Sequence, residues 1–231
     1  MDKIRYSRQI AVPEIGSDGQ KKLWDAKVLV IGCGALGSMV AMQLCGAGVG
    51  KIGIADFDNV DISNLQRQFF FKTDESGESK AHLTHLRMRA LNPEVEVKVY
   101  NSLITPKIAD ELFPKYDFIV DATDNPESKR MTGELALRHG KGCCIAGVRE
   151  FSGQVMTFLP DSPRFEDFFG NASASGVLPC SLSGVMGPAA ALCASIQASE
   201  AIKFITGAGK LLSGRLLLFN LLNNTFRTLS F

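Results

Sequence analysis

A glycine-rich turn and the carboxylate that follows it form the most recognisable chemical pattern in the sequence. Gly32-Cys33-Gly34-Ala35-Leu36-Gly37 has the spacing G-x-G-x-x-G. Between a strand and a helix, such glycines allow a tight turn and let phosphate oxygens approach backbone N–H groups at the helix N-terminus. Asp56 ends the next expected strand, where a carboxylate can accept hydrogen bonds from ribose hydroxyls. Together they predict an adenine-nucleotide site, without separating ATP from NAD.

Three further charged side chains favour an ATP site over an NAD site. Arg67 stands in the segment 63–68, just after the ribose-binding strand, and Lys80 opens the following helix. Asp124 belongs to the segment 121–125, at the carboxyl end of the fourth expected strand, where such sheets bind ligands. Hydride transfer needs none of the three. In adenylyl transfer, Arg67, Lys80 and Mg²⁺ held by Asp124 would neutralise the leaving pyrophosphate. The plain alternatives are a solvated surface for the cations and a helix N-cap for the aspartate.

The elements that must position these residues alternate along the first two thirds of the chain. We expect strands at residues 27–31, 51–56, 95–100, 117–121 and 143–147, and helices at 35–47, 78–91, 106–113 and 126–139. Short β-branched runs that alternate with helices of this length predict a doubly wound, mostly parallel, Rossmann-like α/β sheet.

After residue 153 the pattern changes and predicts an antiparallel extension of the sheet. We expect strands at 154–159, 216–220 and 225–229 and a buried helix at 185–206, with the last two strands joined at Asn223-Asn224. The whole chain, 1–231, is interpreted as a single domain. Its parts are an N-terminal arm at 1–25 with a short helix around 18–24, a nucleotide-binding core at 26–150, and a C-terminal part at 151–231 with a crossover loop at about 161–184.

Composition excludes several classes of partner. Of the 231 residues, 45% are hydrophobic, and 25 Lys and Arg nearly cancel 24 Asp and Glu. A formal net charge of +1 gives no bulk electrostatic reason to bind nucleic acid or an anionic membrane. The first residues form no apolar signal core, and prolines interrupt the longest stretch without charge. We therefore expect a cytoplasmic protein with no nucleic-acid or membrane partner.

The six cysteines form no C-x-x-C pair and are interpreted as reduced thiols, most of them apolar fillers of a core. Cys180 differs, because it follows Pro179 in a Ser- and Gly-rich loop where a thiol could act as a nucleophile. A passive loop cysteine is the alternative. His82 and His85 share an expected helix face, but without a third ligand nearby they indicate a solvated face rather than a metal site.

Several segments together carry a resemblance to a known family. They are residues 5–10, 32–37, 56–58, 63–68, 121–125 and 197–203. With these motifs the chain resembles, over nearly its whole length, the ubiquitin-activating-type adenylyltransferases of the molybdopterin and thiamine pathways (MoeB/ThiF type). The resemblance implies MgATP-dependent adenylation of the C-terminal glycine of a small ubiquitin-like sulfur carrier ending in Gly-Gly, with release of pyrophosphate.

The resemblance also implies roles for individual residues. Asp56 would bind ribose, Asn64, Arg67 and Lys80 the phosphates, and Asp124 would be the Mg²⁺-linked catalytic acid. Arg8 would reach the γ-phosphate of the neighbouring subunit in a homodimer. The nucleotide site as a whole would comprise Gly32, Gly34, Ala35, Gly37, Asp56, Asp58, Ser63, Asn64, Arg67, Lys80, Asp124 and Asn125.

The sequence departs from the family pattern in ways that bear on the later chemistry. Ala35 replaces a usual glycine of the turn, which adds one methyl group. The two C-x-x-C pairs that hold a structural zinc in many relatives are absent, so we expect no zinc site. Cys180 could form a covalent link to the carrier, or the adenylate could pass to a separate sulfur donor. Two other classes stay open, a non-catalytic scaffold subunit of an activating enzyme and an NAD-dependent oxidoreductase.

Overall fold

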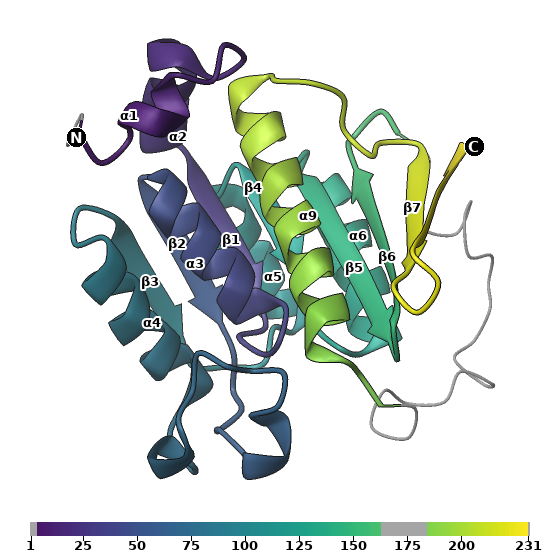
Figure 1. Ribbon diagram of the computed structural model, residues 1–231. Coiled ribbons are helices and arrows are strands. Elements are labelled where there is room, and N and C mark those ends of the chain that lie inside the picture. The colour runs from purple at the N-terminus through teal and green to yellow at the C-terminus, as the bar shows by residue number, and fades with distance from the viewer. Residues whose placement is uncertain (1–3, 163–183, 231) are drawn as a thin grey trace.

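The computed structural model describes residues 4–162 and 184–230, and its centre is one eight-stranded sheet in the order β3-β2-β1-β4-β5-β6-β7-β8 (Figure 1). The parallel strands are β1 (Lys27–Ile31), β2 (Lys51–Ala55), β3 (Glu96–Tyr100), β4 (Phe118–Asp121) and β5 (Gly142–Arg149). Antiparallel pairing then adds β6 (Ser152–Phe158), β7 (Arg215–Asn220) and β8 (Thr225–Ser230). The predicted fold class, a mostly parallel doubly wound sheet with an antiparallel C-terminal extension, is confirmed.

Helices cover both faces of this sheet. One face carries α3 (Gly37–Ala47), α4 (Lys80–Leu91) and α9 (Gly187–Thr206), and the other carries α5 (Pro106–Leu112) and α6 (Pro126–Arg138) (Figure 1). Successive side chains of β1 alternate between the two layers: Val28 and Val30 pack with α3 and α9, whereas Leu29 and Ile31 pack with α5. The parallel strands are therefore buried on both sides, as their continuous apolar sequences predict.

Two adjacent cysteines on β5 follow the same alternation. Cys143 belongs to the core layer under α5 and α6, and Cys144 to the layer under α3 and α9. Within residues 4–162 and 184–230 the cysteines are buried, free thiols: Cys33, Cys45, Cys143, Cys144 and Cys193. Burial raises the pKa of the Cys45 thiol to about 11 and that of Cys193 to about 12. The interpretation of these five residues as core fillers is confirmed.

The N-terminal arm contains two helices where one was expected, α1 (Ser7–Ile10) and α2 (Gly16–Asp25). A four-residue helix is too short to show a hydrophobic period, so the sequence gives no signal for α1. The arm is held at the amino end of the strands, because α2 leads directly into β1. Tyr6 is buried there, and its hydroxyl accepts a 2.7 Å hydrogen bond from Asn92. Gln9 donates to the carbonyl of Ala47 at 3.0 Å.

The long helix α9 is fixed to the sheet by polar groups as well as by apolar packing. The buried carboxylate of Glu200 accepts hydrogen bonds from Thr157 on β6 (2.6 Å) and from the backbone N–H of Leu212 (2.7 Å). Gln197 donates to the carbonyl of Asp121 at the end of β4 (2.8 Å). The Gln197 bond ties α9 to the edge of the sheet where the site residues lie, and the Glu200 bonds fasten it near the other end of the strands.

None of the helices in the described part of the chain combines the length and the apolar character that crossing a bilayer requires.

Candidate functional site

The glycine turn joins β1 to α3 and is closed tightly on itself. Gly32 has φ +91°, a conformation that favours glycine, and a Cβ there would lie 2.9 Å from the carbonyl oxygen of Ala122. A Cβ on Gly37 would lie 1.7 Å from the carbonyl oxygen of Gly32. At Gly34 the nearest atom would be 3.4 Å away, so space alone does not require glycine there. Ala35 packs partly against the core, which accommodates its methyl group.

Asp56 binds the turn through its carboxylate. Its Oδ2 accepts a 2.5 Å hydrogen bond from the backbone N–H of Cys33, and its Oδ1 accepts one of 2.7 Å from that of Asp58. Burial raises the pKa of Asp56, and the two N–H groups and the Lys80 ammonium offset only part of that shift. Asp56 is thus a structural link between the turn and β2. Its predicted contact with a ribose stays a prediction.

Lys80 is the first residue of α4 and lies almost entirely inside the protein. Its ammonium forms a 3.1 Å ion pair with Asp58, with the lysine side chain 7% exposed and the aspartate 51% exposed. The backbone N–H of Lys80 also donates to the Asp58 carbonyl (3.0 Å). Asp58 therefore holds the ammonium beside the glycine turn from its solvent side, where a phosphate could share it.

The segment 63–68 forms one hydrogen-bonded cluster around Asn64. Asn64 Oδ1 accepts from Gln68 Nε2 (2.9 Å) and from the Arg67 guanidinium (3.4 Å), which also donates to the carbonyl of Ser63 (3.3 Å). Gln68 is buried against Gly34 and connects the cluster to the glycine turn. Gln68 is a member of the site that the sequence analysis did not assign, although its amide stands inside the matching motif.

A buried ion pair fixes the turn at the end of β4. Asp121 is fully buried, and its Oδ1 lies 3.2 Å from the ammonium of Lys129 on α6. The same oxygen accepts from the Thr123 hydroxyl (2.7 Å) and backbone N–H (3.1 Å), and Lys129 also donates to the Thr123 carbonyl. Lys129 was not predicted as a site residue from the sequence. The signal for it is a lysine at helical spacing among the buried positions of α6, which include Thr132.

Asp124 and Asn125 follow this turn and differ in their roles. The side chain of Asn125 caps α6, accepting from the backbone N–H groups of Glu127 (2.8 Å) and Ser128 (3.3 Å). The N-cap suggested as the alternative role of Asp124 therefore belongs to its neighbour, and Asp124 is exposed at the carboxyl edge of the sheet. The predicted nucleotide contact of Asn125 stays a prediction.

The carboxylates at this edge suit a magnesium ion. Mg²⁺ in nucleotide sites is held by one or two protein carboxylates together with substrate phosphates. Asp124 offers an exposed carboxylate, and the neighbouring Asp121 has a buried Oδ2 that accepts no hydrogen bond from the described residues. An oxygen donor set of this kind fits Mg²⁺ and is ill suited to softer metals.

One predicted site residue, Arg8, is not brought to this edge, and another, Cys180, lies outside the described residues. Arg8 is exposed on α1, in the arm at the amino end of the strands, whereas the glycine turn and Asp124 lie at the carboxyl end (Figure 1). Arg8 is therefore distant from the glycine turn of its own chain, and its predicted role toward a neighbouring nucleotide stays a prediction. Cys180 and most of the expected crossover loop lie outside the described residues, so the nucleophile role of Cys180 stays a prediction.

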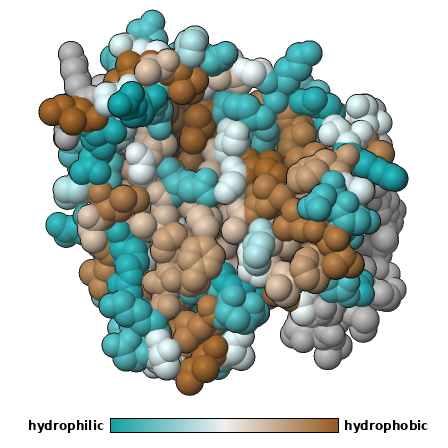
Figure 2. Space-filling model, viewed as in Figure 1, coloured by the Kyte–Doolittle hydropathy of each residue, from teal (hydrophilic) through white to brown (hydrophobic). Residues whose placement is uncertain are grey.

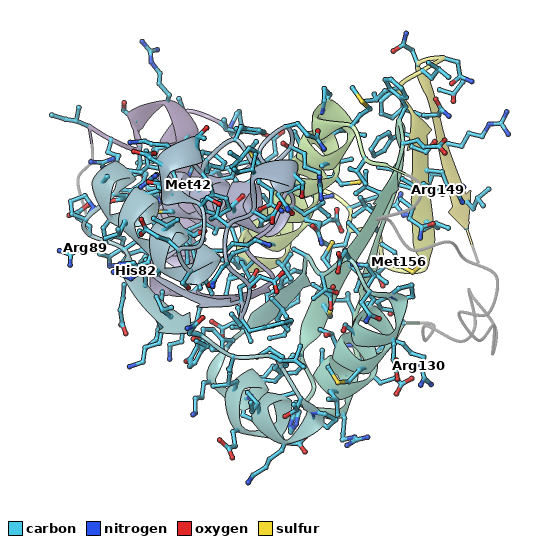
Figure 3. The ribbon with its side chains drawn as sticks, turned by 90° about the horizontal axis from the view of Figure 1, so that it is seen from below. Met42, His82, Arg89, Arg130, Arg149 and Met156 are labelled. Carbon is cyan, nitrogen blue, oxygen red and sulfur yellow. The ribbon has the colours of Figure 1, made fainter. Side chains whose placement is uncertain are left out.

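The two histidines of α4 do not form a metal site within the described ranges, where no group of three His, Cys, Asp or Glu side chains is suited to an ion. Figure 3 shows His82 and Arg89 on the outer side of α4, at the margin of the molecule. His85 is half-buried, and burial together with the charge of Arg89 lowers its pKa. The expectation of no structural zinc concerns segments beyond these ranges as well and stays a prediction.

The fold and the glycine turn define a Rossmann-like α/β protein. The chain belongs to the ThiF family, which it matches over residues 6–231. It is 40% identical to the probable adenylyltransferase/sulfurtransferase MoeZ of Mycobacterium tuberculosis, over 98% of this chain and 59% of that protein. It is 37% identical to the sulfur carrier protein adenylyltransferase of Thermus thermophilus, over 98% of this chain and 86% of that one. The chain thus spans about three fifths of the length of MoeZ.

Solved structures share the fold over the whole chain. The crystal structure of Escherichia coli MccB with ATP superposes with a TM-score of 0.85 at 22% identity, covering 99% of this chain and 72% of that one. The crystal structure of PaaA gives a TM-score of 0.83 at 24% identity, covering 99% and 73%. At these identities the likeness shows a common fold and no more.

Proposed function

We propose that this chain adenylates the C-terminal glycine of a small ubiquitin-like sulfur carrier, with ATP and Mg²⁺. In this reaction a carboxylate oxygen of the glycine attacks the α-phosphorus of ATP, and the bond from that phosphorus to the bridging oxygen breaks. The products are an acyl-adenylate and pyrophosphate. Family membership and the names of the MoeZ and Thermus relatives support adenylation of a carrier protein.

The observation that carries the proposal is the clustering of cations around the glycine turn. Lys80 is held beside the turn by Asp58, and Arg67 is bound to Asn64, whose other partner Gln68 packs on the turn. Charge that gathers on departing pyrophosphate is stabilised best by donors already fixed in place, because they need no reorganisation during the reaction. We assign Arg67 and Lys80 to the phosphates and Asp56 to the ribose.

Asp124 is assigned to the metal-linked catalytic position. Bound Mg²⁺ would supply charge neutralisation for the phosphate oxygens. The Asp121–Lys129 pair and the cap formed by Asn125 hold the backbone on either side of Asp124, so its carboxylate would be presented in a fixed direction.

We further propose a homodimer that uses the face formed by α3 and α9. Figure 2 shows apolar side chains gathered over these helices in the middle of that face. The residues concerned are partly buried: Met39, Met42, Leu192, Ile196, Ile202 and Ile205. The sequence of α3 contains no charged residue, which is unusual for a helix that faces water. A second copy of the chain would cover this surface and could supply Arg8.

The proposal extends to the pathway that the carrier serves and to the way in which sulfur reaches it. The carrier would serve thiamine or molybdopterin-type cofactor biosynthesis. Sulfur would then reach the acyl-adenylate either through a covalent link at Cys180 or from a separate donor protein. Adenylation uses only the nucleotide-site residues and should survive Cys180→Ser in both cases.

Carrier-dependent exchange of labelled pyrophosphate into ATP tests the proposed reaction. Asp124→Ala should lower the exchange rate by at least about two orders of magnitude, the scale of removing one electrostatic stabiliser. Asp18→Ala, at an exposed carboxylate on α2, is the matched control and should exchange at the wild-type rate. An unimpaired Asp124→Ala protein would contradict the assignment. No exchange by the wild type with any Gly-Gly carrier would favour a scaffold subunit.

A further inference from the structure

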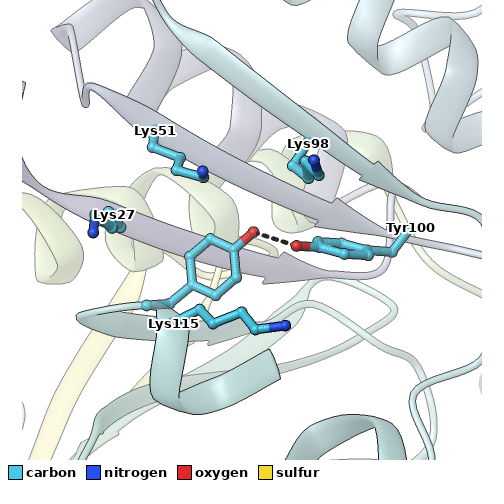
Figure 4. Close-up of a pocket in the computed structure, with 6 residues that line it drawn as sticks. Lys27, Lys51, Lys98, Tyr100 and Lys115 are labelled. Carbon is cyan, nitrogen blue, oxygen red and sulfur yellow. Dashed lines mark hydrogen bonds between the residues drawn. The ribbon is translucent and has the colours of Figure 1, made fainter. Parts of the chain in front are cut away.

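A hollow lined by four lysines and two tyrosines lies on the sheet away from the candidate nucleotide site. Its volume is about 450 Å³, which falls in the range of small-molecule pockets. The lining residues are Lys27, Lys51, Lys98, Tyr100, Lys115 and Tyr116. None of them belongs to the residues assigned to ATP. Figure 4 shows the labelled lysines arranged around the hydrogen-bonded tyrosine pair.

The sheet register explains why these side chains meet. Lys27 on β1 pairs with Lys51 on β2, and Lys98 on β3 pairs with Gly53. Residues two apart on a strand share a face, so Lys51 and Gly53 point to the same side as Lys98. Gly53 leaves room for Tyr116, because a Cβ there would lie 2.3 Å from the Tyr116 hydroxyl. The small residue on the middle strand thus seats the Tyr116 hydroxyl among the lysines that line the hollow.

The charge around the hollow is mainly positive. The ammonium of Lys51 binds Glu96 at 2.7 Å, and Asp117 accepts from the backbone N–H of Lys27 at 2.8 Å. Among the described residues, no carboxylate lies within ion-pair distance of the ammonium groups of Lys27, Lys98 and Lys115. Glu96, the carboxylate nearby, is bound directly to Lys51 alone. The hydrogen bond from Lys51 and the charges of Lys98 and Lys27 hold the pKa of Glu96 below its usual value.

The tyrosine pair adds a hydrogen-bond donor to the cations. The hydroxyl groups of Tyr100 and Tyr116 lie 2.9 Å apart and share one hydrogen bond. Two hydroxyl groups carry two protons, and this bond uses one of them. Since Tyr116 is buried and Tyr100 is partly exposed, the second proton can be donated into the hollow if Tyr116 donates to Tyr100.

Protection of an open sheet edge is the plain explanation for lysines in such a place. It can account for Lys98, because β3 is the edge strand. It does not account for Lys27 and Lys51, which stand on interior strands, or for Lys115, which lies in the 3-10 turn η3 (Phe113–Lys115) before β4. Lysine ammonium groups bind phosphate as point charges, and a hydroxyl donor complements them.

We propose that this hollow binds a small soluble anion that carries phosphate groups, at a site distinct from the nucleotide site. The cations come from three adjacent strands and η3, and the donor comes from the tyrosine pair. A concave hollow of this size admits a diphosphate-sized group but is not a flat surface for a membrane.

Titration of the ¹⁵N-labelled full chain with inorganic pyrophosphate tests the proposal. The backbone amide signals of Gly53 and Tyr100 should shift in a saturable way and report the hollow. Those of Cys33 and Gly34 report binding at the glycine turn in the same experiment. The double variant Lys27→Gln/Lys98→Gln should weaken binding in the hollow at least about tenfold, because each ammonium attracts the anion directly. Binding at the glycine turn should not change.

Lys107→Gln/Lys210→Gln is the matched control, since it makes the same change in net charge at exposed lysines outside the hollow. It should bind pyrophosphate as the wild type does. Equal weakening in both double variants, or shifts of Gly53 and Tyr100 as large with acetate as with pyrophosphate, would overturn the proposal. So would lysine-dependent binding to phosphatidic acid vesicles without any response to soluble pyrophosphate.

Discussion

The ammonium of Lys129 lies 3.2 Å from Oδ1 of Asp121, and neither side chain is more than 11% exposed. A buried pair of this kind is of uncertain net benefit, because both ions lose their hydration. Removing one partner is costly in every case, since the other charge stays buried without compensation. The pair also sets the backbone that carries Asp124, so its loss should affect stability and activity together.

Lys129→Ala should therefore destabilise the protein by about 3 kcal/mol, the scale of breaking a buried ion pair. Arg130→Ala is the control on the next residue: Arg130 pairs with Glu134 at 3.4 Å, but the two side chains are 54% and 38% exposed. That change should cost less than about 1 kcal/mol. Urea unfolding followed by circular dichroism measures both. Similar losses in the two variants would show that the Asp121–Lys129 pair carries no special energetic role.

Some residues of the site could be predicted from sequence and others could not, for a physical reason. Gly32, Gly37 and Asp56 were recognisable because a tight turn and the strand after it impose their spacing locally. Gln197 on α9 donates to the carbonyl of Asp121, which lies 76 residues earlier in the chain. Lys129 is close to Asp121 in sequence, but it reaches the aspartate only because α6 packs back against β4. Such contacts depend on how the helices pack on the sheet, and local sequence patterns do not predict that packing.

At the scale of elements, the glycine turn and α3 depend on each other. Gly37 begins α3, and a Cβ there would collide with the Gly32 carbonyl oxygen at 1.7 Å. Gly46, in the same helix, has only Leu91 Cδ2 at 3.7 Å from the corresponding position, an ordinary contact. The same substitution at Gly37 and at Gly46 therefore tests the effect of this steric overlap within one helix.

Gly37→Ala should destabilise the protein by more than about 2 kcal/mol, because the backbone of the turn must move to relieve the overlap. Gly46→Ala should stabilise it by about 0.5–1 kcal/mol, since alanine loses less conformational entropy in a helix. Thermal unfolding of both variants measures this: the melting temperature should fall for Gly37→Ala and rise for Gly46→Ala. A Gly37→Ala protein as stable as the wild type would mean that the turn is not closed as described.

Besides the Asp58–Lys80 pair, a second ion pair holds the segment between β2 and α4 to that helix. Glu75 in the 3-10 turn η2 (Thr73–Glu75) binds Arg87 and also accepts from the backbone N–H of Lys72 at 2.9 Å. Burial raises the pKa of Glu75, but the hydrogen bond from Arg87, that N–H group and the nearby charges outweigh it, so the net pKa is below the usual value.

Glu75→Gln should therefore have a pH-dependent cost. A carboxyl whose pKa is lowered by folding stabilises the fold above its unfolded pKa, near 4.5, and this contribution is lost as the pH falls through the folded value. We expect a loss of about 1 kcal/mol at pH 7, shrinking below about pH 4.5. Urea unfolding at pH 7 and pH 4 measures it, with Glu14→Gln at an exposed carboxylate as the control. A cost that does not change with pH would contradict the ionic explanation.

Helices and strands were predicted well where the hydrophobic period or the apolar run in the sequence was long, and less well elsewhere. The strands of the parallel sheet and the long helices follow from their apolar runs. The short helix α1 was missed, and β5 extends to Arg149, two residues beyond the expected end at 147. The last part of β5 pairs only with β6, as Gly147 with Gln154 and Arg149 with Ser152. That pairing between neighbouring strands lengthens β5 beyond its apolar run.

At the scale of the whole molecule, the two ends of the sheet are occupied differently. The carboxyl end carries the glycine turn, Lys80 and Asp124, and the amino end carries the N-terminal arm with Arg8 (Figure 1). Tyr6 is buried against α3 and α4, which fixes the arm in this position. A guanidinium that serves the chemistry from this arm must therefore serve a different subunit.

We predict that Arg8 acts across the proposed dimer as a charge-stabilising finger on the neighbouring nucleotide. Arg8→Ala and Asp124→Ala should each be inactive in pyrophosphate exchange. In a mixed dimer, the site with an intact Asp124 receives Arg8 from the other subunit, so one of its two sites is complete. Random exchange of equal amounts makes half of the dimers mixed, and about a quarter of wild-type activity should return. Subunit exchange is followed by native mass spectrometry of differently tagged chains, and mixing either variant with itself is the control. If Arg8 served its own subunit, no mixed dimer would hold a complete site, and activity would stay absent after exchange is complete.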